Sequence, residues 1–151
     1  MVNYIIPGLW EHHKLNILFA SLLKRFPEFF YDNIRIASIF GNFQFCTWDG
    51  GRIFKDYKQA TYEDINSLID IYNNQLDIAL RFTFTSPVIE EEDLFDRYNN
   101  LVLELAHNNK NEIVVNSPIL EQYIRTNYPN YKLISSTTKC LSNIKDSKKE
   151  L

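Results

Sequence analysis

Apolar residues in the first part of the chain recur at the spacing of an α-helix. Between positions 13 and 30 they fall three or four residues apart, as expected for one face of a helix. These residues are Leu15, Leu18, Phe19, Leu22 and Phe26. The spacing predicts a helix over 13–30 with one apolar face and with Lys14, Lys24 and Arg25 elsewhere on its surface. Residues 33–40 are β-branched or apolar at most positions and predict a strand covered on both faces.

A turn signal follows this strand. An Asp-Gly-Gly sequence at 49–51 separates the mostly apolar run 43–48 from the shorter run 52–54. Asp-Gly between two such runs is the pattern typical of a β-hairpin. We therefore predict a hairpin over residues 43–54, directly after the first predicted strand.

Three further strands are predicted, over 76–85, 112–115 and 131–135. In the first of these, alternate positions divide the side chains between two faces of the strand. One face carries Ile78, Leu80, Phe82 and Phe84, and the other carries Ala79, Arg81, Thr83 and Thr85. The large apolar residues are expected to contact helices, so the Arg81 face is expected to point away from the helices.

Helix start signals lie between the predicted strands. Thr61 is a predicted N-cap, and Ser117 followed by Pro118 is a second one. The acidic run 90–93 is expected in the first turn of a long helix, where carboxylates favour the positive end of the helix dipole. Because helical patterns separate all four strands, we predict a single α/β domain over residues 1–151, built as a parallel sheet of about four βα units. An open flavodoxin-like sheet is less favoured, because no glycine-rich phosphate loop follows the first strand.

Composition and charge exclude several classes of protein. Hydrophobic residues make up 45% of the chain and aromatic residues 15%, which excludes a disordered polyelectrolyte. A net charge of -3 provides no basic field that would attract phosphate backbones, so we expect no nucleic-acid partner.

Cysteine content and hydropathy indicate the compartment. Two cysteines are too few for a disulfide framework, which fits a reducing environment. The N-terminus lacks a signal-peptide pattern, and the longest helical apolar stretch, 17–23, is far shorter than the roughly 20 residues of a membrane span. We therefore expect a cytoplasmic protein that does not enter a membrane.

Polar residues follow the predicted strands where parallel α/β folds bind ligands, at the strand C-termini. These candidate ligand contacts are Asn42, Thr83, Thr85, Asn116, Ser136, Thr138 and Lys139. They can donate and accept hydrogen bonds but include no acid–base pair, so they suit binding better than proton transfer. Ordinary turn and cap chemistry is the alternative, since Asn, Ser and Thr favour such positions.

Arg81 is a further candidate, because a strand-interior arginine on the face opposite the helices needs an anionic partner. Two interpretations remain open. The partner is either an anionic ligand or a carboxylate of the chain itself.

Cys46 and Cys140 are thiol candidates, since both follow predicted strand C-termini. A cysteine nucleophile needs a nearby base, and the histidines lie before the first strand or at a helix end. The sequence therefore indicates no Cys/His pair. It also predicts no metal site, and catalytic residues and cofactors stay unassigned.

Four segments together resemble a known family. Residues 41–52, 81–85, 111–118 and 135–140 resemble the N-terminal half of an uncharacterised family of (β/α)-barrel proteins from anaerobic low-GC bacteria. That family is distantly similar to collagenase-like peptidase barrels. The resemblance implies a partial, half TIM-type barrel in a protein truncated relative to full-length relatives. Such a half-barrel exposes strand edges and one sheet face, which favours a homo-oligomer.

Two functions are therefore expected as alternatives. In the first, the chain is a fragment of a barrel enzyme-like protein that binds a small anionic or peptide-like ligand at the strand C-termini. Arg81 and Asn116 would contact the ligand, and Cys46 or Cys140 would serve as a thiol or a metal ligand. In the second, it is a non-enzymatic interaction protein or a self-associating half-barrel that uses the exposed aromatics of the 43–54 hairpin.

Overall fold

Within the part of the chain that the structure describes, five parallel strands form one sheet in the order β1-β2-β3-β4-β5. The computed structural model describes residues 1–51, 58–142 and 144–150. Its strands are β1 (Val2–Pro7), β2 (Ile34–Gly41), β3 (Ala79–Phe84), β4 (Glu112–Val115) and β5 (Lys132–Ser135). The four predicted strands are confirmed. β1 was not predicted, because its side chains are mostly exposed and show no alternation.

Helices connect successive strands, as predicted for an α/β fold. The longer ones are α1 (His13–Arg25), α2 (Tyr62–Ile69), α3 (Arg97–Leu105), α4 (Pro118–Asn127) and α5 (Ile144–Glu150). Short helical segments are η1 (Pro27–Phe29), η2 (Asp70–Gln75), η3 (Glu91–Phe95) and η4 (Thr137–Lys139). Thr61 caps α2 in a reciprocal capping box with Asp64, and Ser117 caps α4 with Pro118 in the first turn. The acidic run begins η3 rather than the long helix that was expected.

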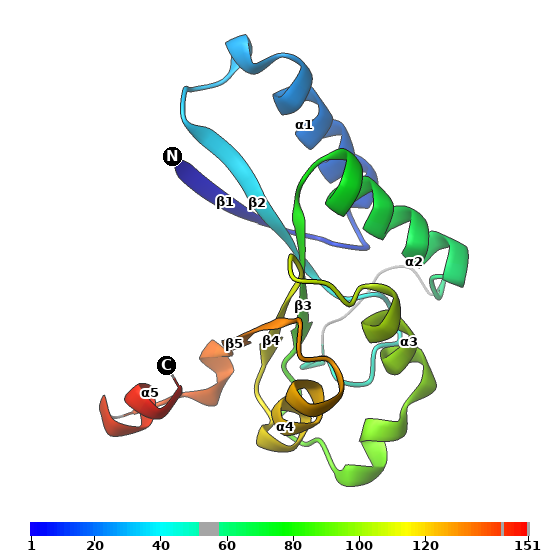
Figure 1. The fold of residues 1–151 in the computed structure, drawn as a ribbon, viewed down its shortest axis with the longest axis vertical. Coiled ribbons are helices and arrows are strands. Elements are labelled where there is room, and N and C mark those ends of the chain that lie inside the picture. The colour runs from blue at the N-terminus through cyan, green and yellow to red at the C-terminus, as the bar shows by residue number, and fades with distance from the viewer. Residues whose placement is uncertain (52–57, 143, 151) are drawn as a thin grey trace.

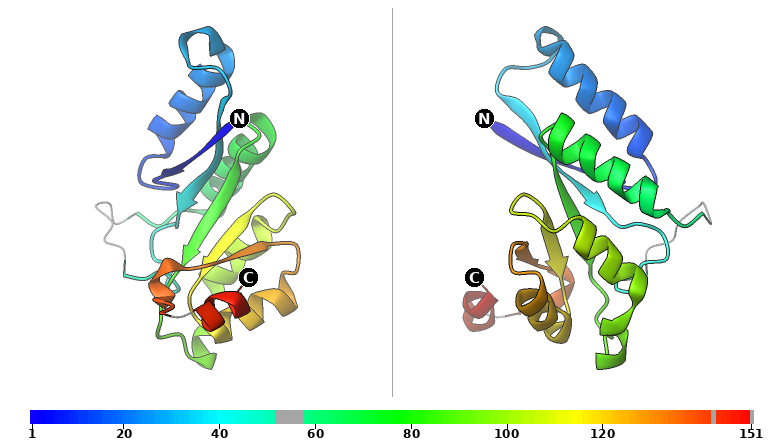
Figure 2. Two further views of the ribbon diagram at one scale, coloured as in Figure 1. Left: turned by 90° about the vertical axis from the view of Figure 1, so that its left-hand side faces the viewer. Right: turned by 45° about the vertical axis from the view of Figure 1, so that its right-hand side comes forward.

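The helices α1 to α4 lie on one face of the sheet (Figures 1 and 2). Right-handed crossovers between neighbouring strands in sequential order place the helices on the same side. This order differs from the 2-1-3-4-5 order of flavodoxin-like folds, and the described strands do not close into a barrel. The fold is thus a partial α/β barrel-like sheet. We call the face opposite the helices the inner face.

The core lies between the sheet and these helices. Leu80, Phe82 and Phe84 of β3 are fully buried there, which confirms the predicted division of β3 into two faces. Trp48 packs edge-on against Phe84 with 5.4 Å between ring centroids, and its indole N–H donates to the carbonyl of Asp93 at 2.8 Å. The loop after β2 is therefore anchored to η3 and to the end of β3.

The predicted helix over 13–30 is present as α1, and its apolar face lies outward rather than against the core. Its buried residues are Asn16 and Ala20, and the Asn16 amide donates to the carbonyls of Pro7 at 2.9 Å and Gly8 at 3.1 Å. These bonds hold the small, polar side of the helix against the turn that follows β1. The residues of the predicted apolar face are between 37% and 65% exposed, and we call them the α1 apolar surface: Leu15, Leu18, Phe19, Leu22 and Phe26.

The predicted hairpin is also wrong in its first arm. Residues 43–51 form turns and bends, and the expected second arm, 52–54, lies outside the described residues. Phe43 and Trp48 are buried in the core, which leaves Phe45 as the one exposed aromatic side chain of 43–51. Within 43–51, Phe43 and Trp48 therefore pack against their own chain rather than facing a partner.

Candidate functional site

Asn42 extends the hydrogen bonding between β2 and β3 by one step. Its side-chain amide donates to the carbonyl of Thr83 at 2.7 Å, and its carbonyl accepts from the Thr83 N–H at 3.0 Å. The residue is 1% exposed. This pairing favours the structural alternative for Asn42, because a side chain that mimics a strand has little polar capacity left for a ligand.

Three of the candidate residues meet in one network at the C-terminal ends of β4 and β5. The Asn116 amide donates to Thr138 Oγ1 at 2.9 Å, and Thr138 Oγ1 lies 2.7 Å from Ser136 Oγ. Ser136 Oγ also accepts from the backbone N–H of Thr138, as the cap of η4. The structure thus brings these side chains together, and they bond chiefly to one another.

Thr85 and Lys139 face other parts of the chain. A Cβ added to Gly50 would lie 2.6 Å from Thr85 Oγ1, so the loop after β2 passes too close to this hydroxyl to carry a side chain. The Lys139 ammonium lies 3.2 Å from Glu121 Oε2 of α4, and its side chain is 7% exposed. The Asn116 amide also donates to the backbone carbonyl of Thr85, at 3.5 Å. The polar side chains at these strand ends thus bond to other groups of the chain.

The two thiols differ in their surroundings. Cys46 packs against the core, and burial raises the pKa of its thiol far above the ordinary value. Cys140 is exposed at the end of η4, and both cysteines are free. The hydrogen bonds of His13 and His107 go to backbone groups, so neither supplies the base that a cysteine nucleophile needs.

Arg81 lies away from these residues, in a hollow on the inner face. Its Nε donates to Glu112 Oε2 at 2.6 Å, and Lys132 Nζ lies 3.2 Å from the other oxygen of Glu112. The hollow has a volume of about 430 Å³. It is lined by Asn3, Ile5, Arg35, Ala37, Asp77, Ala79, Arg81, Lys110, Glu112 and Lys132. We call it the inner hollow.

Cations outnumber carboxylates in the inner hollow by four to two. Glu112 is shared by Arg81 and Lys132, and Asp77 pairs with Lys110, whose hydrogen bond holds the pKa of Asp77 below its ordinary value. The Arg35 Nε donates to an uncharged partner, Asn3 Oδ1, at 2.7 Å. The lining therefore carries a positive charge that the carboxylates lining it do not balance.

Register explains why the sequence did not group these residues. Arg81, Glu112 and Lys132 are successive partners across β3, β4 and β5, so their side chains project from the same face. They stand 31 and 20 positions apart in the chain. No local motif marked the cations at 35, 110 and 132. A usable signal was that predicted strands near the Arg81 strand also carry charged residues that could share its face.

Two buried amide oxygens were also missed. Among the residues that the structure describes, neither Gln44 Oε1 nor Asn99 Oδ1 has a hydrogen-bond partner. Gln44 lies in the loop after β2, and the Asn99 amide donates to Thr47 Oγ1 of the same loop at 2.6 Å. Buried acceptors without a donor are uncommon and costly, so each marks a strained position near the strand ends.

Comparisons with known proteins give no relative. No protein-family model, curated protein or solved structure matches the chain. Within residues 1–51, 58–142 and 144–150, no group of three or more His, Cys, Asp or Glu side chains is placed to hold a metal ion. No helix in these same residues is long and apolar enough to cross a membrane.

Proposed function

We propose that this protein binds a small anionic ligand in the inner hollow. The observation that carries the proposal is the excess of cations there, four against two carboxylates. Arg35 has a neutral partner, and Lys132 is 70% exposed beside a carboxylate that Arg81 already engages. Both cations can therefore turn toward an anion without leaving a buried carboxylate unpaired.

The dimensions suit a small metabolite that carries a phosphate or carboxylate group. A volume of about 430 Å³ falls within the range of small-molecule sites. Arginine forms paired, charge-assisted hydrogen bonds with such groups, and lysine adds a point charge. In this proposal Arg81 positions Glu112, while Arg35 and Lys132 contact the ligand.

The ligand would therefore lie on the inner face, toward the N-terminal ends of β4 and β5, rather than at the strand C-termini. We assign binding and no reaction to this site, because the hydrogen bonds of His13 and His107 involve no cysteine. We also propose a relationship to barrel enzymes, because the sequential strand order supports it. We further propose a cytoplasmic location, which the free thiols support.

The experiment is isothermal titration calorimetry with inorganic phosphate, pyrophosphate and citrate at low ionic strength. We expect at least one of them to bind, and Arg35→Gln and Lys132→Gln each to weaken it by roughly fivefold to tenfold. Arg97→Gln and Lys58→Gln are matched controls, because both are exposed, lie outside the hollow and change the net charge equally.

Two results would overturn the proposal. One is the absence of binding by all three anions up to about 10 mM. The other is an equal loss of affinity in the control variants, which would show that overall charge rather than the hollow attracts the anion.

A further inference from the structure

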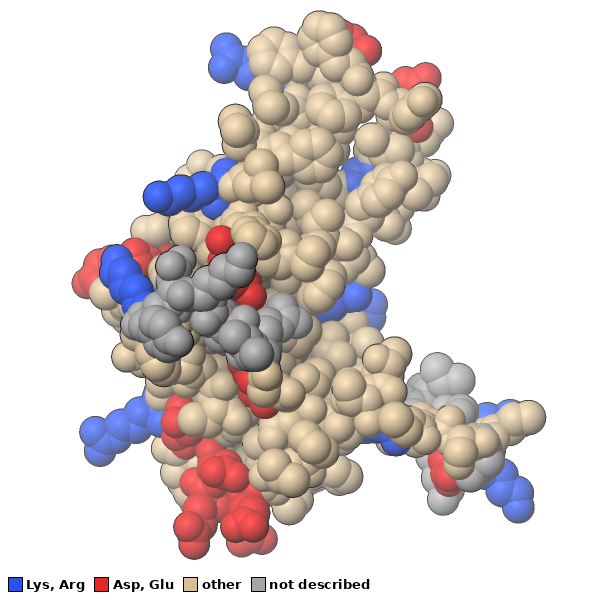
Figure 3. Space-filling view, turned by 180° about the vertical axis from the view of Figure 1, so that it is seen from behind, with Lys and Arg blue, Asp and Glu red and all other residues tan. Residues whose placement is uncertain are grey.

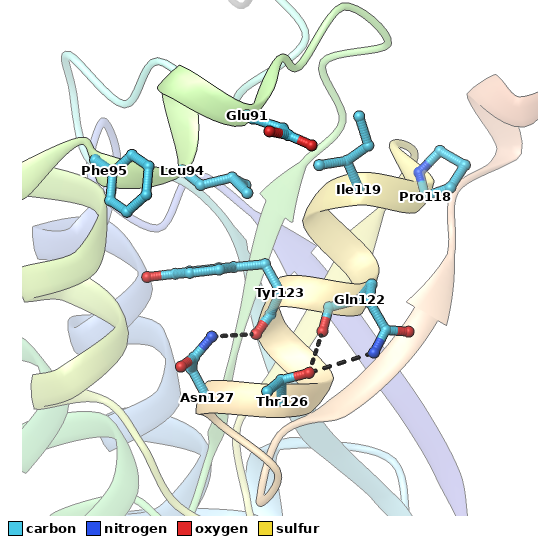
Figure 4. Close-up of a pocket in the computed structure, with 9 residues that line it drawn as sticks. All are labelled: Glu91, Leu94, Phe95, Pro118, Ile119, Gln122, Tyr123, Thr126 and Asn127. Carbon is cyan, nitrogen blue, oxygen red and sulfur yellow. Dashed lines mark hydrogen bonds between the residues drawn. The ribbon is translucent and has the colours of Figure 1, made fainter.

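A groove runs between η3 and α4, on the side of the molecule away from the inner hollow. Its volume is about 590 Å³. Figure 4 shows Leu94 and Phe95 of η3 on one side, Pro118 and Ile119 of α4 on the other, and the Tyr123 ring between the two elements. The remaining lining residues are Glu91, Gln122, Thr126 and Asn127. We call it the η3–α4 groove.

The groove is apolar and held in shape by contacts beneath it. Phe95 is 78% exposed and Ile119 is 43% exposed on its walls. The Tyr123 hydroxyl donates to Asn100 Oδ1 at 2.7 Å, and the Tyr123 ring packs edge-on against Trp48. These contacts hold the Tyr123 ring in place, and the groove walls present apolar side chains that would gain from burial.

One lip of the groove is acidic. Glu90, Glu91 and Glu92 are consecutive and exposed, and none of them forms a salt bridge with another residue of 58–142. Figure 3 shows a patch of acidic side chains at the lower end of the molecule, where η3 lies. Of the described residues that line the groove, Glu91 alone is charged. An occupant with apolar side chains and neighbouring cations would match both features.

The same chain presents a surface of that chemistry. The α1 apolar surface is an exposed helical face, and Lys14 and Arg25 are exposed. At about 100° per residue, these two cations fall along the same side of the apolar face, about three turns apart. The chain thus carries an amphipathic helix with basic residues on its flank, and separately an apolar groove with an acidic lip.

We propose that the α1 apolar surface of one copy docks in the η3–α4 groove of a second copy. Apolar side chains such as Leu18 would enter the groove, and Lys14 and Arg25 would face the acidic lip. The two surfaces are different parts of the molecule, so the contact is head-to-tail and leaves one groove and one helix free at the ends. Such contacts build open chains or closed rings rather than simple two-fold dimers.

Sedimentation equilibrium of the full chain at low ionic strength tests the proposal. We expect the average mass to rise above the monomer's 17.9 kDa with concentration, and to fall when salt is added. Phe95→Asp in the groove and Leu18→Asp on the helix should each weaken association by at least about tenfold, because each places a carboxylate in an apolar contact. Phe45→Asp is the matched control, since Phe45 is 51% exposed and belongs to neither surface.

Mixing the two variants distinguishes this geometry from others. Phe95→Asp retains a working helix and Leu18→Asp retains a working groove, so an equal mixture should form a complex of two chains and stop there. Likewise, Glu91→Lys with Glu92→Lys should weaken association, and adding Lys14→Glu with Arg25→Glu to the same chain should restore it. Circular dichroism confirms that each variant is folded.

Three outcomes would overturn the proposal. The first is a wild-type chain that stays monomeric over the whole concentration range, which would leave the groove to a foreign basic segment. The second is association of the Phe95→Asp variant alone as strong as that of the wild type, which would indicate a symmetric contact between two α1 helices. The third is a mixture of variants that stays monomeric, which would show that the two surfaces do not meet.

Discussion

Replacing Asn42 tests whether the polar residues after β2 serve structure or ligand binding. In Asn42→Ala the backbone N–H and carbonyl of Thr83 both lose their partners, because the side chain supplies both bonds. An unsatisfied buried backbone group costs about 1–3 kcal/mol. The backbone is expected to relax partly around two unsatisfied groups on one residue, so we expect the free energy of unfolding to fall by about 2–4 kcal/mol. That is a large share of the roughly 5–15 kcal/mol that stabilises a typical domain.

Urea unfolding followed by circular dichroism measures this loss. The midpoint should fall while the slope of free energy against urea stays the same, because the folded and unfolded surfaces hardly change. In a thermal scan the same loss corresponds to a drop in Tm of about 4–16 °C for a chain of this size. Asn116→Ala is the control, because the Asn116–Thr138 bond lies at the exposed surface and should contribute less than about 1 kcal/mol.

The reasoning fails if Asn42→Ala unfolds at the same urea concentration as Asn116→Ala. It also fails if Asn42→Ala keeps full stability and loses the binding of phosphate, pyrophosphate or citrate. Either result would mean that the amide of Asn42 is available to a ligand and that β3 is held without it.

Two further predictions concern buried polar groups near the strand ends. With a disulfide reagent at pH 8, the folded chain should react rapidly at the exposed Cys140 and slowly at Cys46, because burial keeps the Cys46 thiol protonated. Cys140→Ser should remove the rapid phase, and rapid labelling of that variant would contradict the assignment. Gln44→Met keeps a similar volume and removes a buried acceptor that has no donor among the described residues, so the free energy of unfolding should rise by about 1 kcal/mol. A lower free energy of unfolding would show that the Gln44 amide has a hydrogen-bond partner in solution.

The alternation of strands and helices could be predicted because it depends on local chemistry. Thr61 and Ser117 cap helices through bonds that span three residues, and β3 divides its side chains between faces by simple alternation. Both features are visible in any short window of the sequence. The same reasoning missed β1, because an edge strand with exposed side chains shows no pattern.

The orientation of α1 shows the limit of periodicity. Its apolar residues mark one face of a helix, but the pattern does not say whether that face meets the core or another molecule. The bonds from Asn16 to the turn after β1 decide the question, and they require a strand that was not predicted. The candidate site depended on tertiary structure in the same way, since Arg81 was recognised and its neighbours were not.

By itself, the sequence determined the parallel α/β class, the helix caps and the polar character of Arg81's face of β3. Each follows from interactions between residues close in the chain, or from burial of apolar side chains at a fixed period. The tertiary structure decided the sequential order of five strands, the outward face of α1 and the alignment of Arg81, Glu112 and Lys132. These depend on which distant segments pair and in which register, and register is set by the packing of whole elements rather than by any short stretch of sequence.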